Sequence, residues 1–364
     1  MTSVPPEEQE LAPSRPRPLR WWWLAAVVTV LAALVGGSTV RLSYYAISPG
    51  GALDVARLVR VEDGHRSYPP KGTVFLCTVS LKRTSVIEAL QGWLDPNIDV
   101  VPAKQIVPPS SDAKRVEKLN LQMMDTSKEQ ALAVAFEHLG YKSVTGKGAL
   151  INEVVVDSPA HAALVPGDTI TAIDGAAVTL HTDAVRILGT HRPGDRVRLT
   201  IDPKDGSAAR DVSVVLAANP KDRSRPQLGV TLSTREPGFS FPFKVDIDSE
   251  GIGGPSAGLA FTLELLDVLT PGELTGGHRV AATGTIELDG TVGEVGGVAQ
   301  KTVAVRRAGA EVFLVPKAEA AEARAHAGKT LRVEPVGDIN DALRILGGLG
   351  GNALTLGQPG RDGA

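Results

Sequence analysis

Two side chains of this sequence could together carry out acyl transfer: the hydroxyl of Ser256 and the amine of Lys301. Ser256 lies in Gly-Gly-Pro-Ser-Ala-Gly (253–258), and Lys301 ends Gly-Gly-Val-Ala-Gln-Lys (296–301). A serine hydroxyl needs a base to act as a nucleophile, and lysine is a known base for it. A free lysine has a pKa of about 10.4, which burial and a nearby helix N-terminus both lower. We therefore expect Lys301 to be buried near the start of a helix, which the following residues predict up to Arg307.

The elements around Ser256 follow from their hydrophobic patterns. The alternating run from Phe241 to Asp248 predicts a strand, and the apolar run from Leu259 to Leu269 predicts a buried helix after the serine. N–H groups in the first turn of a helix have no intrahelical partner, so they can stabilise an oxyanion together with the helix dipole. We predict that the oxyanion region is formed by Gly254, Ala257 and Gly258.

The segment from about residue 240 to residue 348 resembles the proteolytic domain of Lon-type proteases. The matching pieces are Gly-Pro-Ser-Ala-Gly (254–258), Ala-Thr-Gly (282–284) with Ile286 and Gly290, Val-Gly-Gly (295–297) leading to Lys301, and Arg-Ala-Gly-Ala (307–310) followed by Leu-Val-Pro (314–316). The resemblance implies an α/β (α+β) domain with Ser256 as the nucleophile and Lys301 as the general base. It also implies that Thr283 is a supporting residue beside this Ser-Lys dyad.

Composition excludes several other classes. The chain of 364 residues has room for more than one domain, and its net charge of −3 gives no reason to expect nucleic-acid binding. The lone Cys77 excludes an internal disulfide and a multi-cysteine metal site, and no HExxH motif is present. Gly-Lys-Thr (328–330) lacks the earlier glycine of a P-loop, because Ala323 stands there. We therefore expect no cofactor, no metal and no ATP.

The N-terminal segment predicts a membrane anchor. Residues 1–20 are rich in proline and charge and predict a disordered cytoplasmic tail. Three arginines then precede Trp21-Trp22-Trp23 and an uncharged run to Val40, which is long enough to span a bilayer. A cleaved signal peptide is the alternative, although no Ala-x-Ala site follows the run. We predict a transmembrane anchor at 21–40 in the cell membrane, with the catalytic part on the extracytoplasmic side.

The middle of the chain contains a second candidate domain. Residues 41–125 predict a membrane-proximal region in which we find no chemistry, with a strand at Thr73–Val79 and a helix near Ser85–Trp93. In residues 126–220, short strands between glycine turns predict a small β-rich domain. The order Ser-Pro-Ala (158–160), Pro-Gly-Asp (166–168) and Ile-Asp-Gly (173–175) resembles a PDZ domain. The resemblance implies peptide binding at a sheet edge, beside a helix near 181–189, with the carboxylate-binding loop within 141–150.

These observations predict a multi-domain chain with one transmembrane helix, a PDZ-like domain (126–220), a Lon-type domain (226–349) and a loose tail (350–364). The predicted function is ATP-independent hydrolysis of peptide bonds in unfolded or extended extracytoplasmic proteins, which the PDZ-like module captures. Lon-type domains commonly form homo-oligomers, and the sequence leaves this open. One alternative is a non-catalytic membrane scaffold that binds protein partners, because Gly253 stands where the family usually has an acidic residue. Another is an esterase-like nucleophile elbow that uses His278 or His326.

Overall fold

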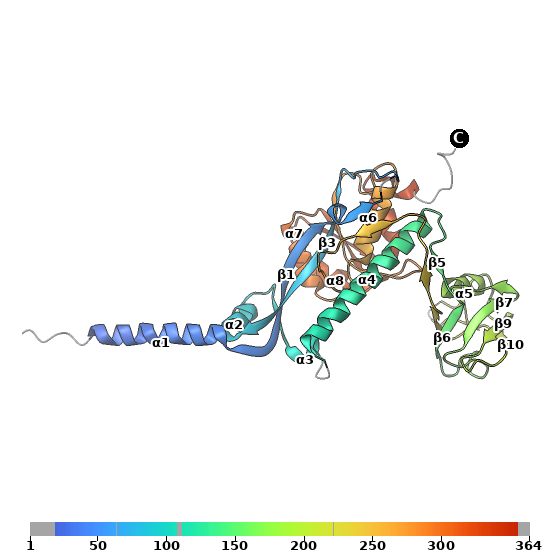
Figure 1. The fold of residues 1–364 in the computed structure, drawn as a ribbon, viewed down its shortest axis with the longest axis horizontal. Coiled ribbons are helices and arrows are strands. Elements are labelled where there is room, and N and C mark those ends of the chain that lie inside the picture. The colour runs from blue at the N-terminus through green and yellow to red at the C-terminus, as the bar shows by residue number, and fades with distance from the viewer. Residues whose placement is uncertain (1–18, 63, 108–110, 221, 356–364) are drawn as a thin grey trace, which may run out of the picture. The chain divides into compact units, whose positions relative to one another are not determined.

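The computed structural model describes residues 19–62, 64–107, 111–220 and 222–355 (Figure 1). The chain divides into two compact units, one made of residues 1–48 and 80–110 and the other of residues 49–79 and 111–364. Strands β1 (Arg41–Asp54) and β3 (Thr73–Ser85) run through both units. The predicted disordered tail at 1–20 lies outside the described residues except for its last two, which begin the first helix.

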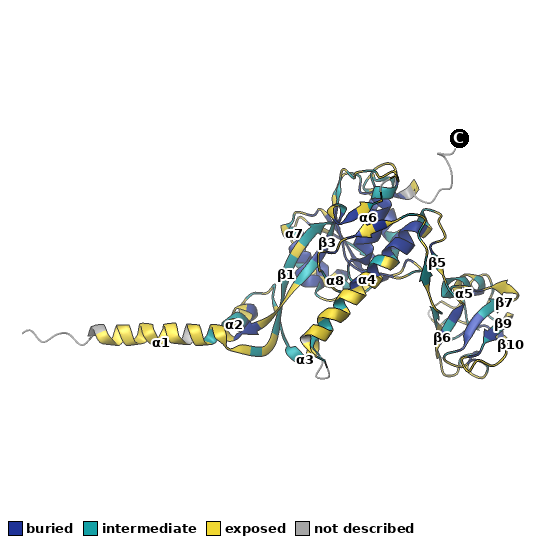
Figure 2. Cartoon of the chain, in the orientation of Figure 1, coloured by how far each residue is buried: buried dark blue, intermediate teal, exposed yellow. Residues whose placement is uncertain are grey.

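The first unit is built on a long apolar helix. Helix α1 (Leu19–Thr39) is exposed along its described side chains (Figure 2) and is long and apolar enough to cross a membrane. The unit continues with α2 (Val86–Leu94), β4 (Asp99–Pro102) and α3 (Ala103–Ile106). Strand β4 pairs antiparallel with β1, where Tyr44 lies opposite Pro102. By length and composition, α1 is a weak indication of a single membrane span.

The second unit contains a parallel sheet that positions both candidate catalytic side chains. Strand β16 (Arg279–Ala282) lies between β3 and β19 (Val312–Pro316), and β20 (Arg332–Val336) pairs with β19, all in parallel. One face packs on helices α4 (Ala113–His138), α6 (Gly258–Leu269) and α9 (Ile339–Gly348). The other face packs on α7 (Val298–Arg307) and α8 (Ala320–His326). Because both faces are covered, the central strand β19 is apolar throughout, and β16 is apolar after Arg279.

Shorter elements complete this part of the unit. Strand β2 (Val59–Val61) pairs with β15 (Val245–Ile247), and β17 (Thr285–Ile286) pairs with β18 (Val292–Gly293). The 3-10 turns are η1 (Val55–Arg57), η2 (Lys317–Glu319) and η3 (Asn352–Thr355). The strand predicted for 241–248 is therefore short, and several turn residues separate it from Ser256. Residues 352–355, predicted to be loose, form a helical turn instead.

The same unit also contains an antiparallel sheet with its own core. Its strand order is β10 (Arg210–Val215), β9 (Arg196–Asp202), β7 (Thr169–Ile173), β6 (Ala149–Val154) and β13 (Val230–Thr234), with β8 (Ala176–Ala177) on β7. Helix α5 (His181–Leu188) packs on this sheet, and the small ladders β5 (Val144–Thr145) with β14 (Gly238–Phe239) and β11 (Ala217–Ala218) with β12 (Pro226–Gln227) flank it. The buried residues form a cluster of their own around Ile151, Ile170 and Leu199.

Strand pairing places three segments differently from the predicted boundaries. Strand β3, predicted to belong to a membrane-proximal region, pairs with β16 of the parallel sheet. Helix α4, predicted to belong to the β-rich domain, packs along α6 instead. Strand β13, predicted to belong to the catalytic segment, pairs with β6 of the antiparallel sheet. Hydrophobic periodicity is local, so it predicts the elements but not their distant partners.

Candidate active site

Ser256 lies in the turn that leads into α6, which begins two residues later at Gly258. Helix α4 holds this turn in place: the Ser127 hydroxyl donates to the Pro255 carbonyl (3.0 Å), and the Gly254 N–H donates to the Asn120 carbonyl (2.8 Å). Gly254 has φ +92°, a conformation that favours glycine. Because its N–H is already bonded to Asn120, Gly254 shapes the turn and does not offer that donor to a substrate.

The close approach of α4 accounts for Gly253. A Cβ at Gly253 would lie 2.9 Å from Cβ of Asn120, closer than real contacts allow. The acidic side chain that Lon-type sequences usually carry here would clash with α4. A similar constraint applies to Gly258, whose added Cβ would lie 2.8 Å from Cγ2 of Ile286. Gly258 thus lets α6 pack directly on the strand after Thr283.

The backbone of Ser256 is tied to the end of β16. Its carbonyl accepts a hydrogen bond from the Gly284 N–H (3.1 Å) and another from the Thr283 hydroxyl (3.3 Å). The Leu259 N–H donates to the Gly284 carbonyl (3.2 Å) and is therefore occupied. Among the described residues, the N–H groups of Ala257 and Gly258 make no backbone hydrogen bond outside the helices. These two amides are available as donors for an oxyanion at this turn, as is the N–H of Ser256, which makes no such bond within the described ranges either.

Lys301 has the expected environment. Helix α7 begins after Gly297, which is left-handed (φ +68°), and the Lys301 N–H closes the first turn on the Gly297 carbonyl (2.9 Å). The residue is only 3% exposed. Burial lowers the pKa of its amine, while Cys77 and Glu319 nearby act in the opposite direction. The geometry favours a neutral amine, the form that a general base requires.

Thr283 connects the two candidate catalytic residues. It is fully buried at the end of β16, where its hydroxyl donates to the Ser256 carbonyl and accepts a hydrogen bond from Nζ of Lys301 (3.2 Å). Among the described residues, no hydrogen bond joins the Ser256 hydroxyl directly to the Lys301 amine. The structure therefore brings Ser256, Thr283 and Lys301 together, with Thr283 as the link. Catalytic hydrogen bonds often form only once substrate binds.

Two residues of this site were not predicted from the sequence. Cys77 is buried in β3 beside Thr283 and Lys301, and burial raises the pKa of its thiol to about 11. Glu319 accepts the Val295 N–H with both carboxylate oxygens (3.2 Å each), so it fixes the loop that leads into α7. The only signal for Cys77 was its place in a predicted buried strand. No pattern linked Glu319 to residue 295.

The two histidines considered for a triad make other contacts. Nδ1 of His278 bonds to Oε2 of Glu311 (2.6 Å) on a largely exposed surface. His326 uses its backbone carbonyl to accept from Arg306 (2.8 Å). Neither histidine bonds to Ser256 in the described part of the chain, so the geometry favours the lysine as the base. In the same described residues, no group of three or more His, Cys, Asp or Glu could hold a metal ion.

A second candidate site is a groove beside the antiparallel sheet. A cavity of about 560 Å³ lies between α5 and β13, the edge strand of that sheet. Val185 and Leu188 line it from the helix, and Val230 and Leu232 line it from the strand. The turn 225–229 also contributes to its lining. The predicted helix at 181–189 is found here. The prediction that a loop within 141–150 completes the site differs from the structure, because no residue of that segment lines the groove.

Comparison with known families is consistent with both sites. Residues 119–214 match the family described as the PDZ domain, and residues 249–346 match the Lon protease (S16) C-terminal proteolytic domain. The chain carries a PDZ domain and a Lon-type proteolytic domain. The relatives include Lon protease 1 of Myxococcus xanthus, 37% identical over 109 residues (29% of this chain, 12% of the relative). Lon protease of Phenylobacterium zucineum is 34% identical over 138 residues (38% of this chain, 17% of the relative).

The chain thus spans less than a fifth of the length of these two Lon proteases. Among solved structures, the PDZ domain of the SdrC-like protein from Listeria monocytogenes is 29% identical (24% of this chain, 87% of that chain, TM-score 0.22). The corresponding domain from Listeria innocua is 27% identical (23% of this chain, 92% of that chain, TM-score 0.22). The PDZ assignment rests on the family match and not on these low scores.

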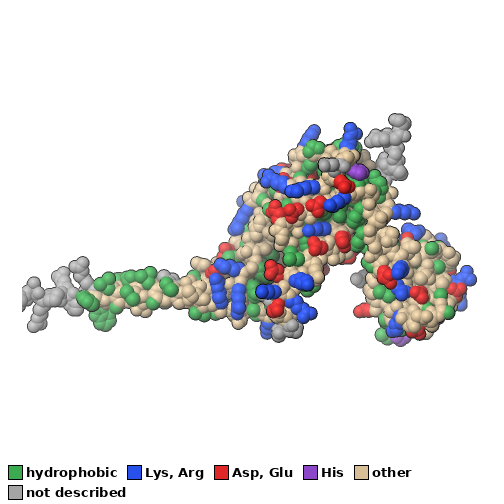
Figure 3. Space-filling model, viewed as in Figure 1, with side chains coloured by type: hydrophobic (Ala, Val, Ile, Leu, Met, Phe, Trp, Pro, Cys, Tyr) green, Lys and Arg blue, Asp and Glu red, His purple; other side chains and the backbone are tan. Residues whose placement is uncertain are grey.

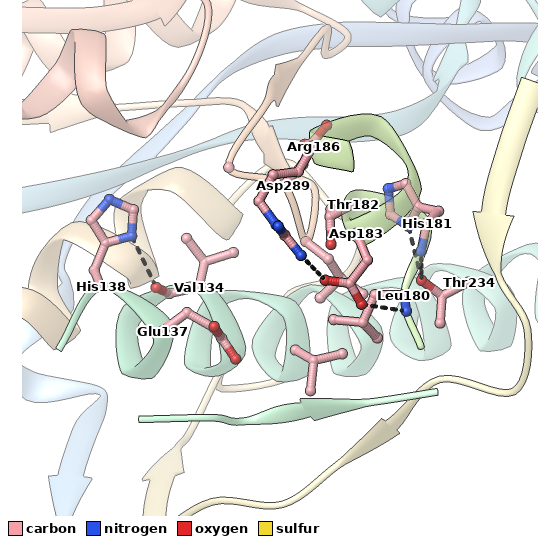
Figure 4. Close-up of a pocket in the computed structure, with 13 residues that line it drawn as sticks. Val134, Glu137, His138, Leu180, His181, Thr182, Asp183, Arg186, Thr234 and Asp289 are labelled. Carbon is pink, nitrogen blue, oxygen red and sulfur yellow. Dashed lines mark hydrogen bonds and ion pairs between the residues drawn. The ribbon is translucent and has the colours of Figure 1, made fainter. Parts of the chain in front are cut away.

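A further cavity of about 340 Å³ contains neither Ser256 nor Lys301. Its lining comes from the end of α4, the start of α5 in the PDZ domain and residues 288–290 of the proteolytic domain (Figure 4). Its polar groups have partners of their own: His138 bonds to the Val134 carbonyl (3.2 Å), and His181 bonds to the Thr234 hydroxyl (2.8 Å). Both histidines therefore already have hydrogen-bond partners within the chain, and we assign no chemistry to this cavity.

Proposed function

We propose that this chain is an ATP-independent serine endopeptidase in which Ser256 is the nucleophile and Lys301 is the general base. The observation that carries the proposal is the hydrogen-bonded link from the buried Lys301 amine through Thr283 to Ser256. A lysine that is buried to this extent and bonded to a neutral hydroxyl is costly to keep charged. Such a cost is typical of a functional group and not of a structural one.

The residues at this site can carry out each proton transfer that the proposed reaction requires. The neutral amine of Lys301 takes the proton of the Ser256 hydroxyl, and the serine oxygen attacks the peptide carbonyl. The N–H groups of Ala257 and Gly258 stabilise the oxyanion, together with the N-terminal end of α6. The Lys301 ammonium then gives its proton to the leaving amine. Lys301 then takes a proton from water as the water oxygen attacks the acyl carbon. The acyl–serine bond breaks, and the Lys301 ammonium returns that proton to the Ser256 oxygen, which restores both side chains.

The PDZ groove supports capture of extended protein segments. Edge strand β13 can pair with a substrate strand, and the apolar residues of α5 and β13 can hold its side chains. Arg225, which also lines the groove, supplies a positive charge suited to the carboxylate of a chain terminus. Tethering a substrate in this way raises its local concentration at the dyad. We propose unfolded or extended proteins as the substrate class.

Helix α1 supports a location at the cell membrane. Its length and apolar composition suit a single span, and arginines precede it in the sequence. Basic residues favour the cytoplasmic side, so we propose that the PDZ and proteolytic domains lie outside the cytoplasm. Protease accessibility in intact cells tests this sidedness: cleavage of the catalytic part from outside supports it, and full protection contradicts it.

The enzymatic proposal is tested with the full chain in detergent, an unfolded protein such as casein and no ATP. We expect Ser256→Ala and Lys301→Ala each to lower the rate by at least ~10³-fold. Ser240→Ala and Lys329→Ala remove the same groups at exposed positions and should leave the rate unchanged. Equal rates for wild type and Ser256→Ala would contradict the proposal. Peptide binding without cleavage by any form would instead favour a membrane scaffold.

A further inference from the structure

Helix α2 has an apolar face that is open to its surroundings. Val86, Leu90, Trp93 and Leu94 recur at helical spacing and are 45%, 55%, 65% and 77% exposed. Leu81, at the end of β3 that leads to the helix, is exposed as well. Scattered apolar residues are normal on a surface, but a continuous stripe on one short helix marks an interaction surface.

The opposite face fixes the orientation of α2. Gly92 lies against β4, and a Cβ added there would be 2.6 Å from Cγ2 of Val100. At its start, the Ser85 hydroxyl accepts the Glu88 N–H, and the Glu88 carboxylate accepts the Ser85 N–H. Ala89 is buried on the same side as Gly92. The helix is therefore held so that its apolar stripe faces outward.

Helix α2 also lies against the last turns of α1. A Cβ added at Gly37, close to the end of α1 at Thr39, would be 3.2 Å from Cγ1 of Ile87. If α1 crosses a membrane, as the proposed anchor requires, α2 lies at the depth where the chain leaves the hydrocarbon. Tryptophan is enriched at that depth, and Trp93 belongs to the stripe.

Positive charge surrounds the stripe. Arg41 and Lys82 both pair with Glu88, at 2.9 Å and 2.5 Å, and the Arg83 guanidinium donates to the Leu42 carbonyl. Arg41 and Lys82 therefore share one carboxylate, and Arg83 adds a third cation nearby. Figure 3 shows Lys and Arg side chains gathered around α2, beside the hydrophobic surface of α1. A basic rim around an apolar stripe is complementary to anionic lipid headgroups.

We propose that α2 lies in the headgroup region of the membrane that α1 enters, with its apolar stripe among the upper acyl chains. This proposal rests on the proposed anchor and adds a second, interfacial contact to it. Arg41 and Lys82, which stay partly exposed beside Glu88, supply positive charge for the phosphates. The contact restricts how the chain emerging from α1 is oriented at the membrane surface.

The test uses the full chain in vesicles of phosphatidylethanolamine and phosphatidylglycerol, with acyl chains brominated near the headgroup. Trp21→Phe, Trp22→Phe and Trp23→Phe together leave Trp93 as the only tryptophan. We expect brominated lipid to lower its fluorescence by about twofold or more, as for an interfacial helix. Leu90→Glu with Leu94→Glu should abolish this quenching. Gln91→Glu, an added charge at an exposed position off the stripe, should leave it unchanged.

A second reporter separates failure of this proposal from failure of the anchor. Replacing Trp21, Trp22 and Trp93 by Phe leaves Trp23 to report on α1. Quenching of Trp23 without quenching of Trp93 overturns the interfacial role of α2 and keeps the anchor. If neither Trp23 nor Trp93 is quenched, both the membrane anchor and the interfacial role of α2 are overturned. A third outcome would be that neither brominated lipid nor aqueous iodide quenches Trp93, and that cysteines placed at position 90 crosslink. This result overturns the proposal and indicates that α2 contacts a second copy of the chain.

Discussion

The proteolytic domain and the PDZ domain bury their polar groups in different ways. In the PDZ domain, the buried carboxylate of Asp168 is paired with Arg210 (3.1 Å) and accepts the Lys204 N–H (3.2 Å). In the proteolytic domain, Glu264 is fully buried on α6, and neither of its oxygens has a hydrogen-bond partner among the described residues. Thr283 is the one side chain in the described part of the chain to which the Lys301 amine donates a hydrogen bond. In the PDZ domain the buried charge of Asp168 has a partner of opposite charge. In the proteolytic domain, burial instead shifts the pKa values of Glu264 and Lys301 toward their neutral forms.

This difference fits the two proposed roles. Binding an extended peptide needs an open apolar edge, and the groove between α5 and β13 provides one at little electrostatic cost. Acyl transfer needs a base that is neutral at working pH, and burial lowers the pKa of Lys301 in that direction. A domain that buries charges in this way loses stability in exchange for reactivity. Four predictions test the contrast, from the largest expected effect to the smallest.

The largest effect is expected for Thr283→Val. This change removes the hydroxyl that joins Lys301 to Ser256 while keeping the shape of the side chain. We expect kcat/KM to fall by ~10²- to 10³-fold, because the amine loses the group that positions it. Thr302→Val is the matched control, since its hydroxyl is equally buried but bonds to the Val298 carbonyl within α7. Equal losses in the two variants would show that Thr283 acts only through packing.

The next effect concerns stability and Glu264. Burial, followed by the charge of Asp267, raises the pKa of Glu264 from 4.5 to about 8. The folded state therefore binds the extra proton between these values, and stability is lost as the pH rises through that window. Glu264→Gln should remove this loss, so its stability relative to wild type should be about 4 kcal/mol greater at pH 9 than at pH 5. Thermal unfolding of the full chain at the two pH values measures it.

Asp168→Asn is the comparison from the PDZ domain. It breaks the pair with Arg210, so we expect it to destabilise the chain at both pH values. If Glu264→Gln and Asp168→Asn both raised stability at high pH, the two buried carboxylates would not differ in how well their negative charge is stabilised.

The third effect is on the pH dependence of cleavage. Because burial lowers the pKa of Lys301, the free amine is present from that lowered value upward. We expect kcat/KM to fall about tenfold per pH unit below it, while peptide affinity of the PDZ groove stays level. Stability, in contrast, should rise with pH between the lowered pKa and that of free lysine, where the unfolded chain binds more protons. A flat rate profile would argue against lysine as the base.

The smallest effect is expected at the groove. Val185→Glu places a charge in its apolar wall, so affinity for a peptide with an apolar C-terminus should fall about tenfold. Val215→Glu makes the same change on β10, at the other edge of the sheet, and should not affect affinity. For both variants, kcat on a short peptide substrate should match wild type. Fluorescence anisotropy and steady-state kinetics separate the two readouts.

Much of the local structure follows from the sequence alone. The apolar run after Ser256 predicts α6, the glycines before residue 298 predict the start of α7, and the uncharged N-terminal run predicts α1. These elements are determined by periodicity and capping within one short segment. The proximity of Ser256 and Lys301 came from a resemblance to a family and not from any local pattern.

The contacts around Ser256 and Lys301 could be determined only from the tertiary structure. That β3 lies beside β16, that α4 holds the Ser256 turn, and that Thr283 links Lys301 to Ser256 all depend on contacts between distant segments. The same holds for β13, whose pairing with β6 forms the edge of the PDZ groove. Gly253 shows why sequence could not supply these: its missing side chain is explained only by the position of Asn120. Local patterns specify elements, whereas strand pairing and close packing are decided by partners far along the chain.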